Sequence, residues 1–232
     1  MNTIIWLEGR LQEARRNQNK NDEGAWLQII GEFYYNTSQY HKAIDSFEIA
    51  LDIAKEIGDK NNEGVCISSL GNAHCDLGQY DTKAIDYFEI ALDIAKEIGD
   101  KNNEGVCISS LGIAYCDLGQ YDKTIDYFEK ALDIAEEIGD KNREGTLNGN
   151  LGDAYSNLAQ YDKAIDYFEK ALVIAKEIGY RNGEGRWNGN LGNAYCNIGQ
   201  YDKAIDCFEK GLHIAKEIVA PSAALFLTPL PK

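Results

Sequence analysis

Four polar side chains near the end of the sequence recur at helical spacing and could hold an extended peptide. Arg186, Asn190, Asn193 and Asn197 follow one another at intervals of four, three and four residues, which places them on one face of a helix. An asparagine amide is both a donor and an acceptor, so a row of amides can bind a peptide backbone without requiring one sequence. A guanidinium can hold a carboxylate through two parallel hydrogen bonds. The alternative interpretation is that these asparagines are ordinary solvated surface residues.

The rest of the sequence contains no pattern typical of an active site or a metal centre. It has no phosphate-binding loop, no nucleophile elbow and no zinc-protease signature. Cys66 and Cys75 are nine residues apart, which turns them to opposite faces of a helix, and we interpret the cysteines as small core residues. His74 stands where similar segments have tyrosine, and we expect it to pack inside the fold. We therefore predict that the chain is not an enzyme and binds no metal or cofactor.

The charge balance restricts the possible partners. Of the 232 residues, 38 are acidic and 23 are Lys or Arg, which gives a formal net charge of -15 at pH 7. Such a chain repels nucleic acid and anionic membranes, so neither is an expected partner. No apolar run is long enough to span a bilayer, and Glu8 interrupts the N-terminal segment before a signal peptide could form. The cytoplasm is the expected location.

A Leu-Gly or Ile-Gly pair recurs along the chain at a nearly constant interval. Its glycines are separated by 40, 41, 40 and 40 residues and lie at Gly31, Gly71, Gly112, Gly152 and Gly192. A fixed period of this length is typical of stacked supersecondary units. The longer second interval is explained by Thr82, which we interpret as an insertion in a loop.

Each repeat predicts two helices joined by a tight turn. In the repeat 140–179, the spacing of Gly152 and Tyr155 places them on the inner face of a first helix. A second helix follows, and we expect Asp162 to cap its N-terminus with a carboxylate. Gly152 is expected where the two helices cross most closely, and Phe168 is expected to fill the space between repeats. Glycine within a helix costs about 1 kcal/mol relative to alanine, so five glycines in one register indicate close packing.

The sequence Leu-Gly-x-x-Tyr followed by Ala-x-x-x-Phe resembles the tetratricopeptide repeat. Its length of about 40 residues is similar to the long-repeat subclass of the Pins/LGN-type proteins, and the name Leu-Gly-Asn stands at residues 70–72 and 191–193. The resemblance implies an all-α, right-handed superhelical solenoid of five antiparallel helix pairs with an N-terminal capping helix. It also implies that Arg186, Asn190 and Asn193 hold an extended segment of a partner.

The first helices of such a solenoid line a concave groove. Counting 100° per residue away from the inward face gives one groove stripe per repeat. The predicted groove residues are Gln28, Glu32, Tyr35, Asn36, Ser69, Asn72, Asp76, Ser110, Ile113, Asp117, Asn150, Asp153, Asn157, Arg186, Asn190, Asn193 and Asn197. Because this set contains four Asp and Glu residues before its single Arg at position 186, we expect a basic or mixed-charge peptide with an acidic anchor near Arg186.

The predicted domain organisation follows the repeats. Residues 1–20 form the capping helix, a degenerate half repeat whose helix spans 3–16. Residues 21–218 form five repeats, and residues 219–232 form an irregular apolar tail that contains the three prolines. Within this tail, Leu225–Leu227 is a possible plug for the last helix pair. The repeat boundaries are 21–58, 59–99, 100–139, 140–179 and 180–218.

The sequence therefore predicts a non-enzymatic scaffold that binds a protein partner through an extended peptide in the groove. Two alternatives stay open. The solenoid could assemble with itself, end to end or through its tail, or the chain could be the regulatory fragment of a larger signalling protein.

Overall fold

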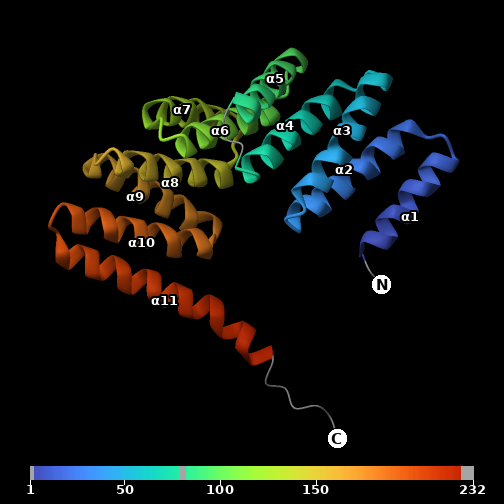
Figure 1. The fold of residues 1–232 in the computed structure, drawn as a ribbon. Helices are drawn as coiled ribbons and strands as arrows, with labels where there is room; N and C mark the ends of the chain where they lie inside the picture. Colours follow the sequence, from blue (N-terminus) through green and yellow to red (C-terminus); the bar gives the residue numbers. More distant parts are fainter. Residues whose placement is uncertain (1–2, 79–81, 226–232) are drawn as a thin grey trace, which may run out of the picture. The chain divides into compact units, whose positions relative to one another are not determined.

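The computed structural model describes the backbone of residues 3–78 and 82–225, and these residues form eleven α-helices (Figure 1). Apart from α1 (Thr3–Arg16), the helices alternate between first and second members of a pair. The first helices are α2 (Lys20–Asn36), α4 (Lys60–Asp76), α6 (Lys101–Asp117), α8 (Lys141–Asn157) and α10 (Arg181–Asn197). The second helices are α3 (Tyr40–Ile57), α5 (Thr82–Ile98), α7 (Tyr121–Ile138), α9 (Tyr161–Ile178) and α11 (Tyr201–Leu225).

The helices form two compact units, Met1–Gln120 and Tyr121–Lys232. The N-terminal unit contains α1 to α6 and the C-terminal unit contains α7 to α11. In each unit, every helix contacts the helix that follows it in sequence (Figure 1). The division falls inside the predicted repeat 100–139, between its two helices.

Helix ends are set by residues that recur with the repeat. Asp59, Asp100 and Asp140 each precede a first helix and accept a hydrogen bond from the backbone N–H three residues later. Gly179 ends α9 in the left-handed conformation, with φ of 70°, which only glycine adopts without strain. The prediction that Asp162 caps α9 is wrong. This helix begins at Tyr161 after Gln160, so Asp162 lies in its first turn, where a negative charge still favours the helix dipole.

The conserved spacing of glycine and phenylalanine has a direct steric cause. A Cβ atom added to Gly152 would lie 2.6 Å from the ring of Phe168, and a Cβ atom added to Gly71 would lie 2.6 Å from the ring of Phe88. The ring therefore occupies the volume that a side chain on the first helix would need. This confirms the predicted close crossing, but it corrects the expected place of Phe168, which packs against Gly152 of its own helix pair.

Tyrosines join each first helix of the C-terminal unit to the preceding second helix. Tyr155 of α8 donates a hydrogen bond to Glu129 of α7 at 3.5 Å, and Tyr195 of α10 donates one to Glu169 of α9 at 3.1 Å. In α4 of the N-terminal unit His74 takes this position, is buried and stacks on Tyr87 with ring centroids 5.4 Å apart. The prediction of a structural histidine is confirmed.

The two ends of the chain differ in how far they match the sequence-based expectation. Helix α1 spans the predicted range and buries Leu7, Leu11 and Ala14 against α2. At the other end, α11 continues past residue 219 to Leu225, where we expected an irregular tail. Alanine has the highest helix propensity and is frequent in this segment, which favours continuation despite one proline. The loop at the Thr82 insertion and the proposed plug 225–227 lie outside the residues whose side chains are described.

Candidate functional site

On each first helix, the predicted groove residues recur at helical spacing and therefore share one side of that helix. We call this side the first-helix face and define it by the predicted groove residues of α2, α4 and α6 in the N-terminal unit and of α8 and α10 in the C-terminal unit. None of the predicted residues is buried, and the most exposed include Glu32, Asp117 and Asn193. Helix α4 contacts α6, and α8 contacts α10, so neighbouring first helices lie within reach of one ligand.

In the N-terminal unit, the first-helix face contains a hollow of about 220 Å³ between α2 and α4. Its lining brings together five predicted residues and one core residue, namely Glu32, Tyr35, Asn36, Ser69, Asn72 and Phe47. Gln28, Asp76, Ser110, Ile113 and Asp117 do not line this hollow. The lining provides one carboxylate, a phenol, a hydroxyl and two amides over an aromatic floor.

Two further acids belong to the same face, of which Asp76 neighbours Tyr35 of this hollow and Asp117 neighbours Asp76. Burial raises the pKa of the Tyr35 phenol, and the neighbouring Asp76 carboxylate acts in the same direction. Burial and the neighbouring Asp76 carboxylate raise the pKa of Asp117 above its ordinary value. Like charges at close range disfavour ionisation, so the face holds its negative charge at an energetic cost that a bound cation would reduce.

In the C-terminal unit, the equivalent acid is paired within the chain. Asp153 on α8 accepts a hydrogen bond from Arg186 Nη2 at 2.9 Å and one from Asn190 Nδ2 at 2.7 Å, both from α10. Burial raises the pKa of Asp153, although Arg186 and Asn190 act in the opposite direction. The side chain of Arg186 is 59% exposed, and an ion pair of this kind contributes about 0–1 kcal/mol, so a ligand carboxylate could compete for it.

The asparagines of α10 do not all present free amides. Asn197 donates from Nδ2 to the backbone oxygen of Asn193 one turn earlier, at 2.9 Å. The ladder expected from the sequence is therefore partly engaged with its own helix. Asn150 and Asn157 lie half-buried and exposed, respectively, on α8.

A second cavity was missed by the sequence reasoning. It has a volume of about 170 Å³ and lies between α4, α5 and α6, where it shares Ser69 and Asn72 with the hollow already described. Part of its lining comes from the second helix α5, through Ala91 and Ile94. Residues counted only along the first helices cannot reveal it, although the small Cys107 in its wall was visible in the sequence.

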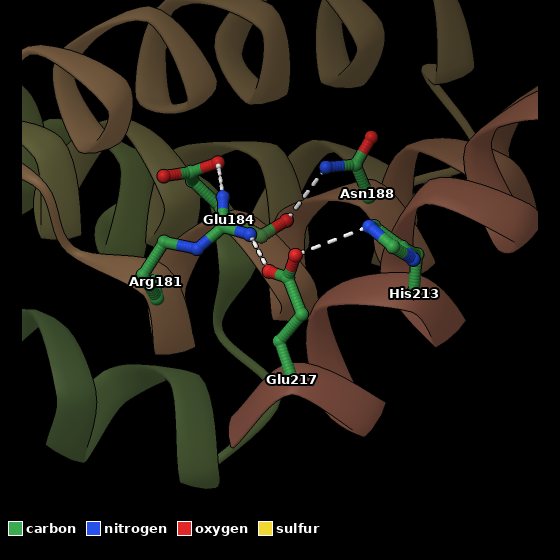
Figure 2. A network of polar contacts seen from close by, with 5 residues as sticks. All are labelled: Arg181, Glu184, Asn188, His213 and Glu217. Atoms are coloured by element: carbon green, nitrogen blue, oxygen red, sulfur yellow. Dashed lines mark hydrogen bonds and ion pairs between the residues drawn. The ribbon is translucent and has the colours of Figure 1, made fainter. Parts of the chain in front are cut away.

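A polar network lies at the start of α10, and none of its residues was among the predicted groove residues (Figure 2). Arg181 donates to buried Glu184 at 2.8 Å and also binds Glu217 of α11. The second oxygen of Glu217 lies 3.1 Å from His213 Nε2, while Asn188 Nδ2 donates to the backbone oxygen of Glu184 at 2.7 Å. The network ties α10 to α11, so its geometry serves packing within the last helix pair.

Two classes of feature are absent from the described part of the chain. No three His, Cys, Asp or Glu side chains in residues 3–78 and 82–225 are grouped as metal ligands would be. None of the helices described here is long and apolar enough to cross a membrane.

Comparison with known proteins gives a consistent fold. The profile of the family described as tetratricopeptide repeat matches residues 23–97, 66–137, 106–177 and 142–217. The structure is similar to that of BtubC (BKLC) from P. vanneervenii, with a TM-score of 0.82 and 22% identity over 99% of this chain and 93% of that chain.

Two other solved structures show the same fold. A Rap protein complexed with competence and sporulation factor has a TM-score of 0.72 and 21% identity over 89% of this chain and 58% of that chain. A kinesin light chain with nearly identical TPR-like repeats from Podosopora anserina has a TM-score of 0.70 and 17% identity over 84% of this chain and 95% of that chain. The comparison with curated protein sequences gave no match.

Proposed function

Because this chain belongs to the tetratricopeptide repeat family, we propose that it is a scaffold that binds an extended segment of a partner protein along its first-helix face. The structure of a Rap protein in complex with competence and sporulation factor supports a binding role for this fold. The observation that carries the proposal is the polar hollow of about 220 Å³ between α2 and α4, next to acids of the same face.

Charge indicates which kind of segment binds to the N-terminal unit. Glu32, Asp76 and Asp117 lie on its first-helix face, and the predicted groove positions of α2, α4 and α6 contain no Lys or Arg. In the C-terminal unit, the Asp153 carboxylate is already opposed by Arg186. A lysine or arginine in the partner would therefore be attracted mainly to the N-terminal unit, where it would also relieve repulsion between Asp76 and Asp117.

The test uses short fluorescent peptides of alternating lysine and alanine, with glutamate–alanine and serine–alanine peptides as probes of charge. We expect the lysine peptide to bind best and to lose about tenfold in affinity with Asp76→Asn and Asp117→Asn together. The two substitutions remove the repulsion between the Asp76 and Asp117 carboxylates in the folded state, so the loss of peptide affinity should not result from unfolding.

The matched control is Asp52→Asn with Asp93→Asn, two exposed acids on the second helices α3 and α5. It changes the net charge by the same amount in the same unit. If the control weakens binding as much as the face variant does, attraction to the overall charge explains the result and the proposed face is wrong.

Self-association is the second candidate, and one observation favours it. Ile205 and Leu212 on α11 are both 56% exposed, whereas the equivalent Ile165 and Leu172 on α9 are 8% and 7% exposed. Burying such side chains in an oligomer would stabilise it. Sedimentation velocity of the native chain and of Ile205→Glu with Leu212→Glu tests this candidate, and a concentration-independent monomer in both would refute it.

A further inference from the structure

The cavity between α4, α5 and α6 has the size and lining of a pocket for one ring. Its volume is about 170 Å³, and none of the residues that line it is charged. Ala91, Ile94 and Cys107 provide apolar surface, whereas Ser69 and Asn72 lie at the first-helix face. An apolar protein cavity of about 150 Å³ can hold a benzene ring.

The equivalent space one repeat earlier is almost closed, and a longer side chain lines it. Between α2, α3 and α4 the corresponding cavity measures about 10 Å³. Cys66 occupies the register of Cys107 in that cavity, and most of the other lining residues are also the same. Gln28, however, stands in the register of Ser68, and we infer that its longer side chain occupies space that serine leaves open.

The equivalent space in the C-terminal unit is filled by an aromatic ring of the chain itself. Trp187 of α10 stands in the register of Cys107, and its side chain is only 3% exposed. A Cβ added to Gly149 of α8 would lie 2.1 Å from the indole Nε1, and one added to Gly183 would lie 2.9 Å from the ring. The indole is thus enclosed where the N-terminal unit has Ser68, Asn103 and an open cavity.

We propose that the cavity between α4, α5 and α6 receives an aromatic side chain of the bound polypeptide, in the place that Trp187 takes in the C-terminal unit. Burying a ring there would remove apolar surface of the cavity wall from water, while Ser69 and Asn72 at its edge offer hydrogen bonds to the peptide backbone. The inference rests on the proposed function, because the cavity opens on the first-helix face.

The wall of the cavity also carries no charge that a buried ligand would have to neutralise. Ser68 of α4 and Cys107 of α6 both line the cavity. Burial raises the pKa of the Cys107 thiol to about 11, although the neighbouring Ser68 hydroxyl acts to lower it, so the thiol is uncharged near neutral pH. An apolar ring therefore meets a wall that carries no charge.

The test measures binding of N-acetyl-tryptophanamide to the full chain by amide chemical shifts in NMR, with N-acetyl-alaninamide as the control probe. We expect saturable shifts in α4 and α6 with the tryptophan probe only. Ser68→Gln copies the closed cavity, and Ser68→Gly with Asn103→Gly and Cys107→Trp copies the filled one. Both should weaken binding at least about tenfold.

The comparison variant is Ser68→Gly with Asn103→Gly, which lacks the new indole and leaves the cavity open, so it should still give saturable shifts with the probe where the triple variant does not. If the triple variant does not fold, Ser68→Gln decides the question. Absence of saturable shifts in the native chain, or unchanged binding in a folded closed variant, would overturn the inference. The probe is uncharged, so the two proposals can fail separately. If the tryptophan probe does not bind but the lysine peptide binds through the acids, the inference is wrong and the proposed function stands. If the probe binds but the lysine peptide does not, the proposed function is wrong.

Discussion

Alanine in place of Gly149 should destabilise the C-terminal unit, whereas alanine in place of Gly189 should stabilise it. The two glycines occupy the same register in α8 and α10, and each lies inside a helix, where alanine is favoured by about 1 kcal/mol. At Gly189 no atom lies within 4 Å of the added Cβ, so the full gain is expected. At Gly149 the Cβ would lie 2.1 Å from Nε1 of Trp187 and 2.6 Å from Cε2.

The indole cannot relieve this contact by moving into solvent, because it is 3% exposed. Overpacking a core of this kind costs about 1–3 kcal/mol, which exceeds the gain in helix propensity. The two variants should therefore differ by about 1–3 kcal/mol in the free energy of unfolding, with opposite signs relative to the native chain.

The assay is urea denaturation followed by circular dichroism, with the transition midpoint and slope compared between variants. In a Trp187→Leu background, which copies Leu147 of α8, alanine in place of Gly149 should no longer destabilise. Equal shifts for the two alanine variants, or a penalty at Gly149 that persists without the indole, would refute the packing argument.

Three further outcomes are expected. Gly152→Ala should lower the free energy of unfolding by up to about 2 kcal/mol in urea denaturation, because contact of its Cβ with the Phe168 ring at 2.6 Å costs about 1–3 kcal/mol and the gain in helix propensity offsets about 1 kcal/mol of this. Asp100→Ala should cost about 1 kcal/mol in the same assay, since it removes the cap of α6. Because the pKa of the Cys107 thiol is raised in the folded chain, the unfolded chain loses this proton at lower pH. The stability of the fold, followed by thermal denaturation, should therefore fall as the pH rises from 9 to about 11. It should fall less in Cys107→Ala, which lacks the thiol.

The helices could be predicted from the sequence because their signals are local and repeated. Gly152 and Phe168 recur at one register, and this regularity alone indicated a close crossing of two helices. Which helix would receive Phe168 is a question of three-dimensional packing, and spacing within one helix does not answer it. Asp162 was assigned as a cap because it follows a polar turn, but the cap position is Gln160, two residues earlier, and boundaries depend on the competition between neighbouring residues for the first turn.

The first-helix face could be predicted as a set of positions, because the angle between residues on a helix fixes which ones share a side. Its chemistry could not be predicted in the same way. Asp153 counted as one of four free acids in the sequence, yet the contact from Arg186 removes it from that set. The pairing joins side chains 33 residues apart, and such long-range contacts carry no signal in a single helix.

The filled space in the C-terminal unit depends on several residues that change together. Tyr180 stands where α4, α6 and α8 have a capping aspartate, and the missing side-chain cap costs about 1 kcal/mol. Its ring instead packs on Trp187, with centroids 5.9 Å apart at 77°, an aromatic contact that contributes about 0.5–1.5 kcal/mol. Glycine at 149 and 183 provides the room, because a Cβ at either position would lie within 3 Å of one of these rings.

The equivalent cavity of the N-terminal unit has none of these four residues. Cys107→Trp alone would therefore place an indole against Ser68 and Asn103, where the C-terminal unit has glycine. That single change should destabilise the chain through overpacking, and the two accompanying glycines should restore part of the stability while the cavity closes. The open cavity is thus separated from the filled one by several simultaneous substitutions, and no single aromatic substitution at Cys107 converts one into the other.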